Sequence, residues 1–145
     1  MKKIFTLLVL TIGFSINAQV GATDKTYTVN TFYAELGGFV IKVRDDGKHG
    51  LVVAMQDQGR TSWWQASDLM VGFYANHDTD GAKFMDWRLP TIRELNLMWG
   101  VYKNGNGANL NNNVHYWSSE VDETNEDNAY YVVFMDNVWG GTQRR

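Results

Sequence analysis

The segment DWRLPTIRELNLMW, residues 86–99, decides how this 145-residue chain folds. Thr91 follows a proline and precedes Glu94 by three positions. This is the spacing of a capping box, in which the threonine hydroxyl accepts from the Glu94 amide and the carboxylate reaches back. Apolar side chains then recur every three or four residues, as on one face of a helix: Ile92, Leu95, Met98, Trp99 and Tyr102. The segment therefore predicts a helix that begins at Thr91, buries one face and ends before Gly105.

Strands and a second helix are predicted before this segment. Residues 39–43 and 50–55 are rich in β-branched and apolar side chains and flank DDGK at 45–48, which is typical of a hairpin turn. A helix is predicted over residues 61–74, because it begins at a threonine-serine pair and carries apolar side chains at helical spacing. Residues 20–31 are polar and are expected to form a loose leader, or a peripheral strand around residues 26–29.

Strands and loops make up the rest of the chain. Residues 104–113 are rich in asparagine and glycine and predict a loop. Residues 115–119 and 129–135 are predicted strands, and a turn at 136–137 leads to Val138 and Trp139. Together with the hairpin, these segments predict an α+β fold in which two helices pack on small antiparallel sheets.

The N-terminus has the pattern of a secretory signal peptide. Two lysines precede an apolar run over residues 4–14, and small and polar residues follow up to Ala18. We expect residues 1–18 to be the signal peptide, 19–36 a leader or peripheral segment, and 37–145 the folded domain. A membrane-spanning helix needs about 20 apolar residues, so no span is predicted after cleavage. The expected location is outside the cytoplasm: periplasmic, extracellular or on the cell surface.

Composition and motifs exclude several classes of function. The chain has 13 Lys and Arg against 16 Asp and Glu, with no basic run, so nucleic acid is not an expected partner. The absence of cysteine excludes disulfides, thiol nucleophiles and cysteine-held metal clusters. Neither a nucleophile-elbow motif nor a zinc-protease motif occurs, and the three histidines are far apart in the sequence. We therefore predict a non-catalytic protein.

Four blocks in a fixed order carry a resemblance to a known family: residues 37–59, 86–99, 116–120 and 128–131. They resemble the Lcl C-terminal-like domain family of bacterial secreted or surface domains, over about residues 35–142. The resemblance implies a C-type-lectin-like fold. Relatives continue past the position of Gln143 into a further V-R-x-V-R strand. The resemblance therefore implies either that the closing strand is missing, which leaves an open edge for another strand or chain, or that the sequence is a truncated copy.

The resemblance also implies where a ligand binds, because loops between the second helix and the last strands form the ligand face of lectin-like folds. Asparagine amides and aromatic rings in these loops suit a glycan or a surface protein. The candidate ligand-binding residues are Asn111, Asn113, His115, Asn125, Asn128, Tyr130, Asn137 and Trp139. Two alternatives are an assembly subunit completed by a partner strand, with oligomers formed through the open C-terminal edge, and a binding protein diversified by a retroelement.

Calcium is the one candidate cofactor. Asp78 and Asp80 resemble the start of an EF-hand loop, but the twelfth position holds Leu89 where that loop needs a glutamate. A second oxygen-rich stretch supplies the candidate ligands Glu120, Asp122, Glu126 and Asp127. The Glu-Pro-Asn and Trp-Asn-Asp signatures of calcium-dependent sugar lectins are missing, and a solvated acidic loop is the alternative.

Overall fold

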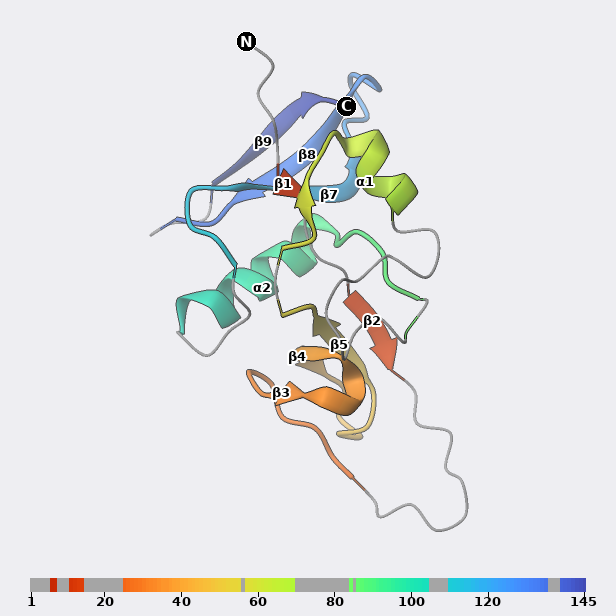
Figure 1. The fold of residues 1–145 in the computed structure, drawn as a ribbon, viewed down its shortest axis with the longest axis vertical. Coiled ribbons are helices and arrows are strands. Elements are labelled where there is room, and N and C mark those ends of the chain that lie inside the picture. Colours follow the sequence, from red (N-terminus) through yellow and green to blue (C-terminus); the bar gives the residue numbers. More distant parts are fainter. Residues whose placement is uncertain are drawn as a thin grey trace.

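The computed structural model describes residues 6–7, 11–14, 25–55, 57–69, 84, 86–104, 110–135 and 139–145. The strands are β1 (Thr6–Leu7), β2 (Thr11–Phe14), β3 (Phe32–Tyr33), β4 (Gly38–Val43), β5 (Gly50–Val53), β6 (Gly59–Arg60), β7 (His115–Val121), β8 (Asn128–Val133) and β9 (Trp139–Arg144). The helices are the 3-10 turn η1 (Ala34–Leu36), α1 (Trp63–Leu69) and α2 (Ile92–Lys103). Figure 1 shows two sheets with α2 between them.

The first sheet has four antiparallel strands in the order β2-β5-β4-β3. β4 and β5 form the predicted hairpin, whose turn is closed by a bond of 2.7 Å from the Arg44 amide to the His49 carbonyl. The Asp46 carboxylate accepts from the Lys48 amide at 2.8 Å and contacts the His49 ring at 2.5 Å. These hydrogen bonds, that of Lys48 first, lower the pKa of Asp46 to about 2. The hairpin prediction is confirmed.

Two glycines let β4 and β5 approach closely. A Cβ atom on Gly38 would lie 2.1 Å from the Val53 carbonyl oxygen, and one on Gly50 would lie 2.0 Å from that of Lys42. Contacts this short are not tolerated between such atoms, so only glycine fits at either position. The neighbouring Gly37 ends η1 with a left-handed backbone, at φ 71°.

The second sheet has five strands in the order β6-β1-β7-β8-β9. Its neighbours are antiparallel except for β1 and β7, which meet in parallel at Thr6 and Tyr116. β8 and β9 pair over six residues without a register shift, from Asn128 opposite Arg144 to Val133 opposite Trp139. β7 and β8 pair as a hairpin with a shift between Trp117 and Val121.

Helix α2 begins at the predicted capping box. The Glu94 amide donates to the Thr91 hydroxyl at 3.2 Å, and the Thr91 amide donates to the Glu94 carboxylate at 2.8 Å. The helix contacts β4 of one sheet and β7 and β8 of the other. Its side chains Leu95 and Met98 are fully buried between them. The predicted helix, its cap and its buried face are confirmed.

Arg88 extends the cap of α2. Its guanidinium donates to both oxygens of Glu94, at 2.8 and 2.6 Å, and to the Leu89 carbonyl at 3.1 Å. Burial opposes ionisation of Glu94, but the hydrogen bonds from Arg88 and Thr91 outweigh it and lower its pKa. The motif before the helix therefore serves structure, since it fixes the direction in which the chain enters α2.

Helix α1 is joined to β7 by two tryptophans. The Trp63 indole donates to the Ser118 carbonyl at 2.7 Å, and the Trp117 indole donates to the Thr61 carbonyl at 3.2 Å. The Arg145 guanidinium lies 4.4 Å from the ring centre of Trp64. Figure 1 accordingly shows the C-terminus beside α1.

The α+β class and the small antiparallel sheets are confirmed. Of the two alternatives for residues 26–29, the peripheral strand is wrong. Those residues are held by separate bonds, such as that from the Tyr27 amide to the Gly47 carbonyl at 2.8 Å, and form no ladder. The end of the first predicted helix, from residue 70, and the turn at 136–137 lie outside the described residues.

The leader and peripheral segments stay predictions. β1 and β2 come from residues 1–18. β1 pairs with β6 and β7 in the five-stranded sheet, and β2 pairs with β5 in the four-stranded sheet. In residues 25–36 the side chains of Tyr27 and Leu36 are buried in the core. Within the described ranges, no helix has the length and apolar character to cross a membrane.

Candidate ligand-binding site

The predicted ligand-binding residues divide between the two ends of the β7–β8 hairpin. Asn111, Asn113 and His115 lie at the start of β7, and the backbone of Trp139 lies at the same end, because both His115 and Trp139 pair with Val133. The remaining described residues lie further along the hairpin: Asn125 and Asn128 at its turn, and Tyr130 on β8. Asn137 and the side chain of Trp139 lie outside the described part of the chain.

Asn111 links two loops that are far apart in the sequence. Its side-chain amide donates to the Asp57 carboxylate, and its backbone amide donates to the Tyr116 hydroxyl at 2.6 Å. Burial raises the pKa of Asp57, against the effect of hydrogen bonds from Asn111 and Tyr116. Burial and the nearby Asp57 charge also raise the pKa of Tyr116. The Asn111 side chain is therefore engaged within the fold, although the residue itself is exposed.

Asn113 and His115 shape the start of β7. Asn113 has a left-handed backbone, at φ 60°, and its amide donates to the Phe134 carbonyl at 2.9 Å. Asparagine tolerates this conformation better than most residues. The His115 ring packs edge-on against Tyr131, with 4.7 Å between ring centres. Both residues position the end of the sheet at which β7 begins.

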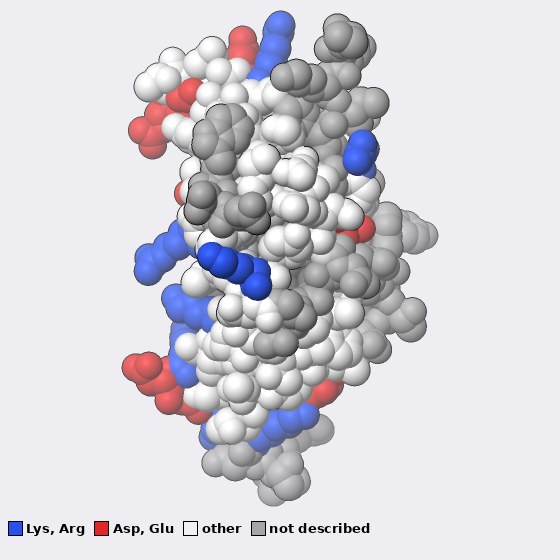
Figure 2. All heavy atoms as spheres, turned by 90° about the vertical axis from the view of Figure 1, so that its left-hand side faces the viewer, with Lys and Arg blue, Asp and Glu red and all other residues white. Residues whose placement is uncertain are grey.

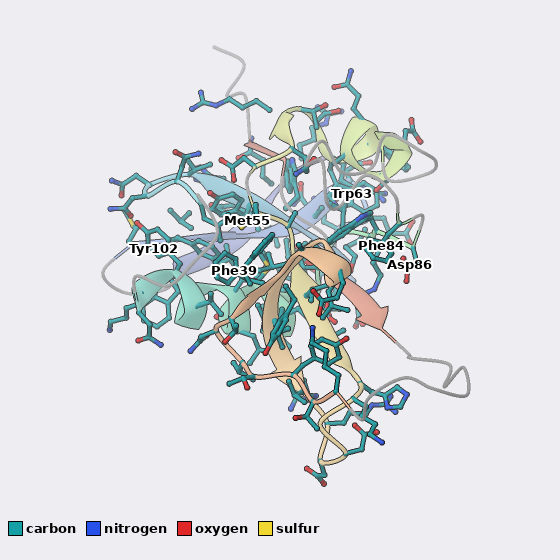
Figure 3. All side chains as sticks on the ribbon, turned by 60° about the horizontal axis from the view of Figure 1, so that its bottom comes forward. Phe39, Met55, Trp63, Phe84, Asp86 and Tyr102 are labelled. Carbon is teal, nitrogen blue, oxygen red and sulfur yellow. The ribbon has the colours of Figure 1, made fainter. Side chains whose placement is uncertain are left out.

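A cavity of about 490 Å³ lies at this same end of the molecule. It is lined by Tyr102, Lys103, Asn112 and Met135. The Tyr102 ring stacks on the buried Phe134, at 5.8 Å between ring centres. Cavities of this size are typical of small-ligand sites. Figure 3 shows Tyr102 at the end of α2, away from Trp63, Phe84 and Asp86.

Among the described residues, the lining of this cavity combines the Tyr102 ring with two kinds of polar group. Lys103 carries an ammonium group that also lies 4.7 Å from the Trp99 ring centre, and Asn112 has an exposed amide. The Trp99 indole donates to the Met135 carbonyl at 2.9 Å, which ties the end of β8 to α2. Such a site offers a flat apolar surface together with donors and acceptors for hydroxyl or carbonyl groups.

Most of this lining was not predicted from the sequence. Tyr102 was expected on the buried face of the helix, and neither Lys103 nor Met135 was expected in a site. The signal that could have found them is their position: Lys103 directly precedes the asparagine-rich segment, and Met135 is the last residue of the predicted strand 129–135.

A second, smaller cavity of about 260 Å³ lies between α2 and the β8–β9 ladder. Tyr130 is the predicted ligand-binding residue that lines it, opposite Ile92 and Asn96 of the helix. Gly140 and Gly141 lack side chains at the sheet, and the Tyr131 ring covers Gly141, whose added Cβ would lie 3.0 Å from the Tyr131 hydroxyl. An added Cβ on either glycine would meet Tyr131, so the glycine pair makes room for Tyr131 beside β9.

The four candidate calcium ligands differ in their hydrogen bonds and exposure. Glu120 accepts from the Ile92 amide at 2.9 Å, at the start of α2. Asp122 accepts from the amide and the hydroxyl of Thr124, at 2.9 and 2.7 Å, and the hydroxyl bond is the main reason that its pKa is lowered. Glu126 and Asp127 are exposed at the turn.

Among the described residues, no group of three acidic or histidine side chains is placed to hold a metal ion. The calcium assignment stays a prediction. The observed bonds at Glu120 and Asp122 favour roles in the helix start and the hairpin turn.

The charges do not form a single-sign surface on the face that Figure 2 shows. Lys, Arg, Asp and Glu are interspersed there among many uncharged atoms. This agrees with the sequence pattern, in which basic residues never form a run.

No protein-family model matches the chain, and no curated protein is significantly similar to it.

Proposed function

We propose that the chain is a secreted, non-catalytic binding module with a C-type-lectin-like fold, and that it recognises a glycan or a surface protein. The observation that carries this proposal is the cavity of about 490 Å³ at the end of α2, beside Asn111, Asn113 and His115. Tyr102, Lys103 and Asn112 supply a ring face, a cation and an amide, which together suit polar ligands with an apolar face.

The α+β architecture supports the lectin-like part of the proposal. Two small sheets with a helix packed between them provide a scaffold on which loop residues can recognise a ligand. The sequence blocks of the Lcl C-terminal-like domain family lie on this scaffold: the first on the β4–β5 hairpin, the second on α2 and the last two on β7 and β8.

Binding to a panel of glycans and bacterial surface proteins tests the function. The exported product of the full-length chain is used, and Lys103→Ala combined with Asn112→Ala should weaken saturable binding at least tenfold. A second pair, Asn137→Ala with Trp139→Ala, probes the neighbouring loop and should also weaken it.

The matched control changes a lysine elsewhere. Lys42 is exposed on β4 and is not a candidate ligand-binding residue, so Lys42→Ala should leave binding unchanged. Asn125→Ala separately tests the predicted residue at the β7–β8 turn. Loss of binding in Asn125→Ala alone, with the fold intact by circular dichroism, would move the site to the hairpin turn and overturn the assignment to the cavity.

A further inference from the structure

The edge of β5 that faces away from β4 is paired with a strand from the N-terminal part of the chain. In the full chain β5 pairs with β4 on one side and with β2 on the other. The β2 pairing is antiparallel and regular over four residues, from Thr11 opposite Val53 to Phe14 opposite Gly50. By contrast, the β4 pairing contains a register shift between Val40 and Lys42.

The strand that pairs with this edge is β2, which belongs to the predicted signal peptide. Cleavage after Ala18 would remove all of β2, together with β1, and would leave β5 at the edge of a three-stranded sheet. This step rests on the secretion in the proposed function.

The exposed edge would have none of the usual protection. Residues 50–55 contain no charged residue and no proline, and Val52, Val53 and Ala54 are fully buried in the full chain. Proteins normally shield edges with short strands, charges or proline, because a regular uncharged edge pairs readily with other chains. The opposite edge of the same sheet, β3, is only two residues long.

The other candidate edges are poorer acceptors. Loss of β1 would also expose β7, but β7 carries Glu120 and pairs with β8 through a register shift between Trp117 and Val121. The resemblance places the open edge at the C-terminus, and β9 does lie at an end of its sheet. However, β9 contains Gly140 and Gly141 and ends at Arg144. Glycine weakens strands, and an arginine at an edge discourages pairing.

We propose that the edge of β5, after loss of residues 1–18, binds an extended, uncharged strand of a partner polypeptide. The strand runs antiparallel to β5 in the place of β2. Main-chain hydrogen bonds supply affinity, as in other cases of strand addition. The observed occupant, residues 11–14, carries no charged residue, which agrees with an uncharged partner strand.

The experiment supplies this strand in trans. The exported product of the full chain is first weighed by mass spectrometry to confirm the loss of residues 1–18. A labelled peptide of residues 9–16, VLTIGFSI, is then titrated by fluorescence anisotropy. Binding should saturate, and hydrogen exchange of the amides of residues 50–53 should slow at least tenfold with peptide bound.

Matched variants test whether the peptide binds through its main chain and at the edge of β5. The peptide with Ile12→Pro lacks one amide donor and should bind at least tenfold more weakly. In the protein, Leu51→Lys on β5 should weaken binding, whereas Val43→Lys on β4 should not. The peptide variant leaves the protein unchanged, so it decides the matter even where a lysine prevents folding.

Several outcomes would overturn the inference. They are retention of residues 1–18, equal binding of the proline peptide, or protection of β9 in place of β5. A dimer by light scattering that the peptide dissociates would assign the edge to a second copy of the chain. Glycan and surface-protein binding, measured on the same preparation with peptide in excess, reports the proposed function separately.

Discussion

At the scale of single residues, side-chain hydrogen bonds hold the start of α2 in place. Thr91, Glu94 and Arg88 form one connected set of hydrogen bonds, and Glu120 adds a bond from β7 to the Ile92 amide. Free amides at a helix start need partners, and here side chains supply them. This set therefore fixes the helix against the sheet.

Replacing Thr91 tests the cap. Thr91→Ala removes the hydroxyl that accepts from the Glu94 amide and should lower the free energy of unfolding by about 1 kcal/mol in urea titrations. Thr91→Ser keeps an acceptor and should lose much less. Equal losses in the two variants would show that the methyl group, and not the cap, is responsible.

Asp57 makes stability depend on pH in an unusual direction. Its folded-state pKa is raised mainly by burial, and its second oxygen is buried without a hydrogen bond in the described part of the chain. The ionised carboxylate is therefore a penalty in the fold above that pKa. The penalty is relieved as the pH falls through the raised pKa toward the ordinary value near 4.

Asp57→Asn removes this dependence. Relative to the variant, the natural chain should gain stability as the pH is lowered from 7 to about 4, measured by urea unfolding at each pH. Asp46 is the control with the opposite sign. Its pKa of about 2 means that its contribution is present above the ordinary value and is lost as the pH falls toward 2. A natural chain that loses stability relative to Asp57→Asn on acidification would contradict the assignment.

At the scale of elements, one glycine in a strand and one in a helix have different roles. Gly50 lies where β5 meets β4, and a Cβ there would lie 2.0 Å from a backbone oxygen. Gly100 lies in α2, and no atom within 4 Å would meet its Cβ. The first permits close approach of two strands, whereas the second only weakens a helix.

Alanine at these two positions should therefore shift stability in opposite directions. Gly50→Ala forces the hairpin apart and should cost at least about 2 kcal/mol. Gly100→Ala should raise the free energy of unfolding by about 0.5–1 kcal/mol, because alanine loses less freedom in a helix. Thermal unfolding by circular dichroism measures both, and a destabilising Gly100→Ala would reveal a contact that the structure lacks.

At the scale of the whole molecule, α2 joins the two sheets into one core. Its buried side chains contact β4 on one side and β7 and β8 on the other. Neither sheet is large enough to bury a core alone, and strands gain stability from such packing. We therefore expect the two sheets to unfold together.

Leu95 and Leu97 on the same helix test this coupling. Leu95 is fully buried, whereas Leu97 is 37% exposed. Leu95→Ala should cost about 2–5 kcal/mol, and Leu97→Ala less than about 1 kcal/mol. Native-state hydrogen exchange of Leu95→Ala should accelerate equally in β5 and β8. Faster exchange in one sheet alone would show that the sheets unfold separately.

The parts of the fold that local sequence determines could be predicted. The β4–β5 hairpin follows from its turn residues, and α2 follows from its cap and its apolar spacing. The strand expected at 26–29 failed because β propensity does not ensure a partner. There the backbone bonds to the Gly47 carbonyl and the Val40 carbonyl at separate points.

The candidate site could be predicted only in part, because it depends on contacts distant in sequence. Asn111 meets Asp57 across 54 positions, which no local pattern indicates. The loop residues at the two ends of β7 look equivalent in sequence. A seven-residue strand separates them by roughly 20 Å at the usual rise per residue.

The bond between the Trp63 indole and the Ser118 carbonyl has a consequence for the order of folding. It joins residues 55 positions apart, whereas the β4–β5 hairpin closes a short local turn. Contacts between residues distant in sequence form slowly, because closing a long loop costs conformational entropy before the contact can stabilise the chain. We therefore expect the β4–β5 hairpin to form before the contacts between α1 and β7, and the pairing of residues 115–133 to come late in folding.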